Sequence, residues 1–206
     1  MDFAGILKSL PAVTVRQPNE VSRDELLAKA RAMARRGYVH SEETLAALEA
    51  YLQGYGVLLS GGLGIGKSLF FETVNPEPIK VLSFNRCHLW TADQLGDWLD
   101  QNVGNEIVCD DIGWDAEKAR NYGQRFETLQ YVLDARLTMS GCRTHFTTNL
   151  TNEELIGKYD AHLVDRIYQL CKCFALTPRE SRREATVYWS YIRNRSYERK
   201  MGKEEL

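Results

Sequence analysis

The sequence predicts an α/β fold in which a parallel five-stranded sheet is flanked by helices. Strand-like apolar runs alternate with helical segments along most of the chain, and parallel strands need such long crossovers. The first of these runs leads directly into a glycine-rich loop. The composition of the 206 residues, 44% hydrophobic and 26% charged, is typical of a globular protein rather than of a disordered chain.

Two helices are expected before the sheet. Ser22 and Glu25 have the spacing of a capping box, which would begin a helix that runs to about Arg36. A second helix is expected over 41–53, because leucines recur there on one face. We assign residues 1–44 to an N-terminal arm and helical extension, which is a candidate for binding a partner protein.

Five runs have the apolar and β-branched character of strands, and helical segments lie between most of them. The expected strands are 55–60, 79–84, 106–109, 143–147 and 171–176. Both faces of the sheet should therefore be covered by helices.

The first expected strand is followed by a phosphate-binding motif. Gly61, Gly66, Lys67 and Ser68 match the pattern G-x-x-x-x-G-K-S/T, and a helix-compatible run follows. Glycines let consecutive backbone N–H groups turn toward an anion, lysine reaches the terminal phosphates, and serine offers a hydroxyl to Mg2+. The residues expected to bind the nucleotide here are Gly61, Gly62, Leu63, Gly64, Ile65, Gly66, Lys67, Ser68 and Leu69.

Acidic and amide side chains follow two later strands. Asp110 and Asp111 end the run NEIVCDDIG, where Asp110 can hold Mg2+ and Asp111 can polarise an attacking water. Asn149 stands at the tip of RTHFTTNL and offers an amide that senses the γ-phosphate. A plain loop residue before the Thr151/Glu154 helix cap is the alternative interpretation of Asn149.

The set GGLGIGKS, VCDDIG, THFTTNLTNEEL and YDAHLVDRIYQL resembles the AAA+ ATPases of the DnaC type, which are bacterial or phage replicative helicase loaders, and their relative IstB, a transposition helper ATPase. The resemblance runs over about 45–183 and implies an AAA+ P-loop NTPase domain of the ASCE type, without a full C-terminal lid. It leaves 184–206 as a basic and aromatic tail. It also implies ATP or ADP and Mg2+ as ligands.

The resemblance assigns roles to single residues. Lys67 and Ser68 match Walker A, Asp110 and Asp111 match Walker B, and Asn149 matches sensor 1. Asp111 stands where most AAA+ proteins carry a glutamate, and its shorter side chain is expected to slow hydrolysis. The implied catalytic set includes Lys67, Asp111 and Asn149, and the implied metal ligands are Ser68 and Asp110.

Three arginines complete the set that the resemblance implies. Arg166, in LVDRI, matches the arginine finger, which in this family reaches the ATP of a neighbouring subunit. A surface ion pair with nearby acids is the alternative for Arg166. Arg182 and Arg183 fall where the family carries a sensor 2 arginine, and the sequence does not choose between them.

The function expected from the resemblance is ATP-dependent loading of a replicative helicase of the DnaB type, by a homo-oligomer that binds single-stranded DNA. Basic residues in 29–36, in 179–183 and in 188–195 are candidate DNA contacts, and solvated faces are the alternative. A transposition helper that prefers duplex DNA, a nucleotide-gated adaptor with little hydrolysis and a small P-loop kinase remain the other hypotheses.

Cysteine usage and hydropathy indicate a cytoplasmic protein without membrane contact. The five cysteines include no C-x-x-C pair, which favours reduced thiols. No signal peptide is visible in the first ten residues, and no apolar run approaches the roughly 18 residues of a membrane span. The net charge of -2 excludes a general electrostatic attraction to nucleic acid.

Overall fold

Five parallel strands form one sheet in the order β2–β3–β6–β1–β7 in a computed structural model, which describes residues 18–87, 90–114, 119–121, 124–126, 128–138 and 143–177. Every pairing in this sheet is parallel, as the sequence predicts. The strands are β1 (Gly56–Ser60), β2 (Lys80–Ser83), β3 (Ile107–Ile112), β6 (Thr144–Thr148) and β7 (Cys171–Ala175).

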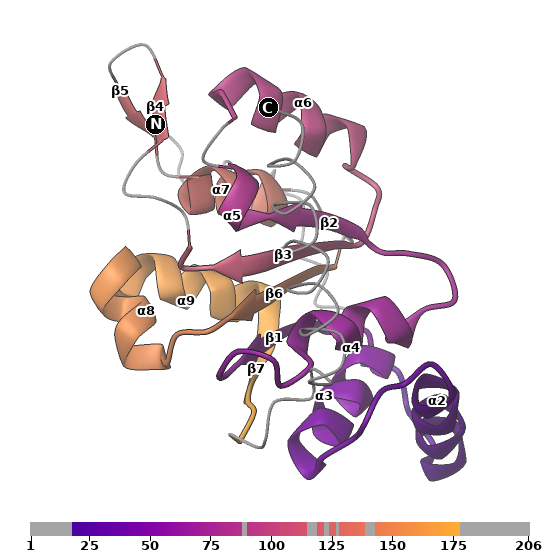
Figure 1. Ribbon diagram of the computed structural model, residues 1–206. Coiled ribbons are helices and arrows are strands. Elements are labelled where there is room, and N and C mark those ends of the chain that lie inside the picture. The colour runs from indigo at the N-terminus through magenta and orange to yellow at the C-terminus, as the bar shows by residue number, and fades with distance from the viewer. Residues whose placement is uncertain are drawn as a thin grey trace, which may run out of the picture.

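The strand order decides which segments meet at the site. β6 lies between β1 and β3, although it follows both in the sequence (Figure 1). Parallel strands end at the same edge, so the segments that follow β1, β6 and β3 lie side by side. The glycine-rich loop follows β1 and Asn149 follows β6, whereas the two aspartates lie within the last residues of β3.

Helices connect the strands and cover the sheet. The helices are α2 (Arg23–Arg35), α3 (Glu42–Leu52), α4 (Lys67–Val74), α5 (Phe84–Cys87), α6 (Ala92–Gln101), α7 (Thr128–Thr138), α8 (Asn152–Tyr159) and α9 (Ala161–Leu170), with a hairpin of β4 (Ala119–Asn121) and β5 (Gln124–Phe126) before α7. The expected helix starts at Ser22 and Thr151 are confirmed, because each N-cap side chain accepts a hydrogen bond from the backbone N–H three residues later. Thr91 caps α6 in the same way.

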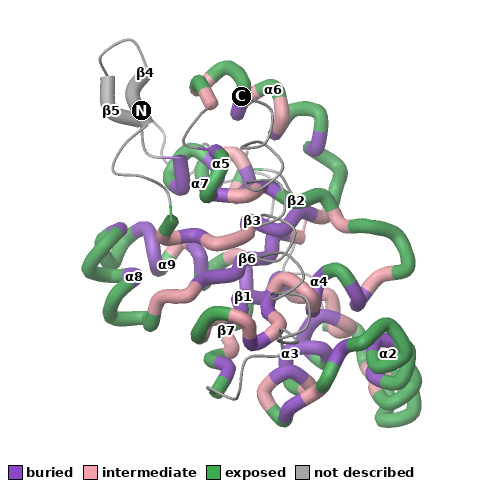
Figure 2. Tube along the Cα trace, in the orientation of Figure 1, coloured by how far each residue is buried: buried purple, intermediate pink, exposed green. Residues whose placement is uncertain are grey.

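Alternation along the strands divides the core between two faces. Val57 and Leu59 of β1 pack with α2, α3 and α4, whereas Leu58 packs with helices α5 to α9. The two groups of helices lie on opposite sides of the sheet in Figure 1, and the central strands are largely buried in Figure 2. Burial on both faces explains why these strands read as continuous apolar runs.

The N-terminal helices are part of this core. Met33 of α2 and Ala47 of α3 are fully buried in the same cluster as Phe70 of α4. The expected boundary between residues 44 and 45 falls inside α3, and it stays a prediction. The tail 184–206 lies outside the described residues, as does the region after residue 177 where a lid would have to lie. In the described part of the chain, no helix is long and apolar enough to cross a bilayer.

Candidate functional site

The glycine-rich loop joins the end of β1 to the start of α4. Gly66 has φ +95 and precedes the helix directly, in a conformation that side chains other than glycine adopt at a cost. Gly61 has φ +140, and a Cβ there would lie 2.6 Å from Ile65 Cδ1 and 2.8 Å from Leu176 O. The loop conformation therefore depends on glycine at both of its ends.

Lys67 begins α4 and turns its side chain back over the loop. Its side chain is buried, and Nζ donates to the carbonyl oxygens of Gly61 and Gly62, both at 2.8 Å. Nζ also donates to Oδ1 of Asn149 at 2.7 Å. The ammonium is thus held between the loop and the tip of β6, with its positive charge at the mouth of the site.

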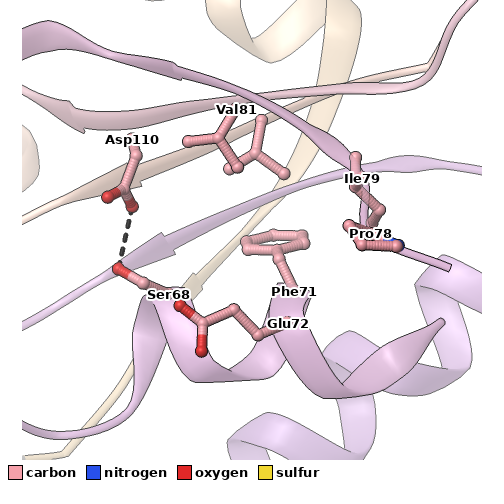
Figure 3. A pocket seen from close by; sticks show the side chains of 8 residues that line it. Ser68, Phe71, Glu72, Pro78, Ile79, Val81 and Asp110 are labelled. Atoms are coloured by element: carbon pink, nitrogen blue, oxygen red, sulfur yellow. Dashed lines mark hydrogen bonds between the residues drawn. The ribbon is translucent and has the colours of Figure 1, made fainter. Parts of the chain in front are cut away.

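Ser68 and Asp110 meet on one side of the lysine. The Ser68 hydroxyl donates to Asp110 Oδ1 at 2.9 Å, which Figure 3 shows as a dashed line. A second hydroxyl, that of Thr147, donates to the same oxygen at 2.6 Å. The two predicted metal ligands therefore offer a hydroxyl and a carboxylate at one point, and hard oxygen ligands of this kind fit Mg2+.

Asp111 lies in a β-bulge. The pairing of β3 with β6 shifts by one residue between Cys109 and Ile112, and Asp111 has φ +58, which is rare for residues other than glycine. The Asn149 Nδ2 group donates to Asp111 Oδ1 at 3.4 Å. The bulge thus turns the second acid toward the Asn149 amide, whereas Asp110 turns toward Ser68.

These residues surround a cavity of about 280 Å3. It is lined by Leu63, Gly64, Gly66, Lys67, Ser68, Leu69, Glu72, Asp111 and Asn149. Ile65 belongs instead to the hydrophobic core, because its side chain is 4% exposed. Glu72 was not anticipated from the sequence, although its position one helical turn after Ser68 on α4 is a signal that would have identified it.

A second cavity of about 240 Å3 lies beside α4 (Figure 3). Ser68, Glu72 and Asp110 line it together with apolar side chains. The apolar lining residues are Phe71, Pro78, Ile79, Val81 and Val108. The predicted metal ligands therefore lie between a polar cavity and an apolar one.

Arg166 is not part of the cavity lining in its own chain. It lies on α9 and forms an ion pair with Asp134 of α7, whose side chain is 55% exposed. A role in a neighbouring subunit stays a prediction. Arg182 and Arg183, the candidate sensor 2 residues, lie outside the described residues.

One of the candidate DNA contacts has a structural role. The Arg36 guanidinium donates to the carbonyl oxygens of Glu72 at 2.8 Å, Thr73 at 3.0 Å and Asn75, at the end of α4. Terminal helix carbonyls lack partners within the helix, so this arginine caps α4. The basic residues in 179–183 and 188–195 lie outside the described residues.

The structure is similar to that of AMPPCP-bound DnaA from Aquifex aeolicus, with a TM-score of 0.53 and 9% sequence identity. The match covers 77% of this chain and 54% of the DnaA chain, so the chain spans about half of that structure. A crystal structure of the DnaC helicase loader also matches, with a TM-score of 0.46 and 16% identity, over 80% of this chain and 96% of that chain. Neither protein-family models nor curated proteins give a match. At these identities the likeness concerns the fold alone, which is an α/β fold of the P-loop NTPase type.

Proposed function

We propose that the protein is an ATPase that loads a replicative helicase of the DnaB type, acting in the cytoplasm as a homo-oligomer on single-stranded DNA. The observation that carries the ATPase assignment is the convergence of five side chains from three segments on one site. These are Lys67, Ser68, Asp110, Asp111 and Asn149.

The loop and Lys67 would bind the phosphates of ATP. The Lys67 ammonium is held by two loop carbonyls and one side-chain amide, so it can exchange these neutral acceptors for phosphate oxygens. Ionic acceptors bind an ammonium more strongly than neutral ones do, which favours this exchange. The start of α4 adds the positive end of a helix dipole on the same side.

Ser68 and Asp110 would hold Mg2+ through oxygen atoms. When bound, Mg2+ neutralises charge that develops on the phosphate oxygens. The carboxylate of Asp110 accepts a hydrogen bond from the Ser68 hydroxyl, which leaves the Ser68 oxygen lone pairs directed away from that bond. Both ligands come from rigid elements, α4 and β3, so little ordering would be needed when they bind.

Asp111 would accept the proton of the attacking water. Asp111 lines the polar cavity together with Lys67 and Asn149, and the Asn149 amide is hydrogen-bonded to both Lys67 and Asp111. A carboxylate within hydrogen-bond reach of the attacking water can act as a general base. Asn149 would orient the acid and the water relative to the phosphate that Lys67 holds.

Arg166 would act on the ATP of a neighbouring copy. Its own chain pairs it with Asp134 on the α7–α9 side, and it does not line the cavity. A guanidinium supplied from a second subunit would stabilise the transferred phosphoryl group and make hydrolysis depend on assembly.

The helicase-loader assignment is supported by the amino-acid sequence and order of the motifs from VCDDIG through DRI and by the helical extension before β1.

The loading function is tested with a DnaB-type hexameric helicase and a single-stranded DNA circle, which has no free end for threading. We expect the chain to bind the helicase with ATP and Mg2+, to increase the amount of helicase on the circle, and to hydrolyse ATP at a rate per subunit that rises with protein concentration. ATP binding without helicase capture, or capture of a transposase on duplex DNA instead, would contradict the loader assignment.

A further inference from the structure

We propose that Thr147 is a positioning residue for both aspartates of the site: its hydroxyl holds the Asp110 carboxylate beside Ser68 and fixes the bulged backbone of Asp111. The inference rests on the proposed nucleotide and Mg2+ binding, and it goes beyond that proposal by assigning a role to a side chain that touches neither ligand.

Thr147 connects the central strand to the acidic end of β3. Thr147 is fully buried, and its Oγ1 donates to Asp110 Oδ1 at 2.6 Å. The same Oγ1 accepts the backbone N–H of Asp111 at 2.8 Å. A carboxylate only accepts and a backbone N–H only donates, so the direction of both hydrogen bonds is fixed. One hydroxyl therefore determines the placement of two consecutive acids.

The bulge explains why a side-chain acceptor is needed at this position. β3 has one residue more than β6 between Cys109 and Ile112, which interrupts the backbone ladder beside Asp111. At this interruption the Asp111 N–H donates to a side-chain acceptor, Thr147 Oγ1 of the neighbouring strand, which holds Asp111 at its positive φ.

The bond to Asp110 has the length of a charge-assisted O–H···O⁻ hydrogen bond. Oδ1 of Asp110 accepts hydrogen bonds from the hydroxyls of both Ser68 and Thr147, which together fix the carboxylate. Without the Thr147 hydroxyl, the carboxylate would be fixed by Ser68 alone and could rotate. Loss of such a supporting bond typically weakens metal binding by about 10- to 100-fold.

The phosphate-binding contacts do not depend on Thr147. Lys67 donates to Gly61, Gly62 and Asn149, whereas the side-chain hydrogen bonds of Thr147 go to Asp110 and to the backbone of Asp111. A change at Thr147 should therefore weaken the Mg2+ dependence of nucleotide binding and leave Mg2+-free binding nearly unchanged.

The adjacent residue provides a matched control. Thr148 is equally buried, and its hydroxyl also joins β6 to β3, because it donates to Ile112 O at 2.8 Å. The same hydroxyl accepts the Leu150 N–H at 3.1 Å, and neither of these two side-chain hydrogen bonds goes to Asp110 or Asp111. Replacement by valine removes a buried hydroxyl in both cases, but only Thr147→Val removes one from the acids.

The experiment titrates Mg2+ into the full chain with a fluorescent ATP analogue and measures the half-saturating Mg2+ concentration and, separately, analogue binding in EDTA. We expect Thr147→Val to raise the half-saturating Mg2+ concentration about tenfold or more. Thr147→Ser, which keeps the hydroxyl, and Thr148→Val should stay near the wild-type value. Binding in EDTA should be similar in all four proteins.

An unchanged Mg2+ requirement in Thr147→Val, or an equal shift in Thr148→Val, would overturn the role of Thr147. If Thr147→Val does not fold, Thr147→Cys keeps similar volume with a weaker donor, and a wild-type Mg2+ requirement in that variant would overturn the role as well. A wild-type protein that binds no analogue with or without Mg2+ would overturn the proposed function itself, together with this inference.

Discussion

The Lys67 ammonium donates to Oδ1 of Asn149 at 2.7 Å, although 82 residues separate the two in the sequence. This bond joins the phosphate-binding loop to the tip of β6, and the Asn149 amide donates in turn to Asp111. Asn149 is therefore the link between the cation and the proposed general base.

Replacing Asn149 tests that link. We expect Asn149→Ala to lower kcat for ATP hydrolysis by roughly 100-fold, because one oriented polar group would be lost from the reacting centre. The nucleotide Kd should change much less, since the loop and Lys67 remain. Steady-state kinetics combined with equilibrium binding measures both, with the exposed Asn85→Ala as control. A loss confined to nucleotide affinity would contradict the linking role.

Arg166 and Asp134 allow the trans role to be separated from a structural ion pair. Both Arg166→Ala and Asp134→Ala remove the same ion pair between α9 and α7, and an exposed pair contributes only about 0 to 1 kcal/mol to stability. We expect Arg166→Ala to lower hydrolysis per subunit at least 100-fold at assembling concentrations, whereas Asp134→Ala retains activity.

Mixing adds a second readout for the same prediction. Arg166→Ala subunits carry an intact cavity, so hydrolysis should return in part when they are mixed with Lys67→Ala subunits that still carry Arg166. Equal activity of the Arg166→Ala and Asp134→Ala proteins would show that the arginine serves only the ion pair.

A buried network at the opposite edge of the sheet makes stability depend on pH. His145 Nδ1 accepts the Val57 N–H at 3.0 Å, and Nε2 lies 2.7 Å from Glu106 Oε1. Burial lowers the pKa of His145 because it disfavours the charged imidazolium, and this effect outweighs the hydrogen bond and the charge of Glu106, which raise the pKa. Burial raises the pKa of Glu106, but the hydrogen bond with His145 and the charges of His145 and Arg143 lower it overall.

Both depressed pKa values act in the same direction. The unfolded chain takes up protons on these groups at higher pH than the folded chain does, so the stabilisation is complete above the ordinary values of 6.5 and 4.5 and is lost as the pH falls. We expect the free energy of unfolding in urea to fall progressively from pH 7.5 to pH 4. His145→Gln should flatten the upper part of this profile, whereas His162→Gln, at an exposed position, should not. A wild-type profile without this fall would contradict the network's role.

Arg36 should contribute to folding rather than to DNA binding. Its guanidinium caps the last carbonyls of α4, and hydrogen bonds from charged groups contribute about 1.5 to 3 kcal/mol, less where solvent reaches them. We expect Arg36→Ala to lower the free energy of unfolding by roughly 1 kcal/mol, and exposed Arg35→Ala to leave it nearly unchanged. Unchanged stability with lost DNA binding would restore the interpretation of Arg36 as a DNA contact.

The sequence was sufficient for the features that local patterns encode. The five strands lie within three residues of their expected ends, because apolar runs flanked by turn residues record burial on both faces. Short motifs predict that Lys67, Ser68 and Asp110 lie near one another, since each stands at or after the carboxyl end of a strand and parallel strands end at one edge. If the strands are parallel, these residues must lie at the same edge of the sheet and therefore close together.

Partners that are distant in the sequence could not be predicted in this way. Thr147 reads as one more β-branched strand residue, and the bulge at Asp111 depends on the register between two strands. Arg136 reads as a solvated helix residue but is 1% exposed, and it donates to the carbonyl oxygens of Asn102 and Asn105. Each of these roles depends on which backbone groups the fold leaves without partners, and no local pattern records that.

Phosphate release from ATP, measured together with nucleotide binding on the same preparations, tests the central claim most directly. The wild-type protein should bind ATP with Mg2+ and release phosphate, and Lys67→Ala should lose binding. Asp111→Asn should keep binding and lose at least about 100-fold in kcat, because the proton acceptor is gone. A wild-type protein that binds no ATP, or hydrolysis that neither substitution reduces, would contradict the account.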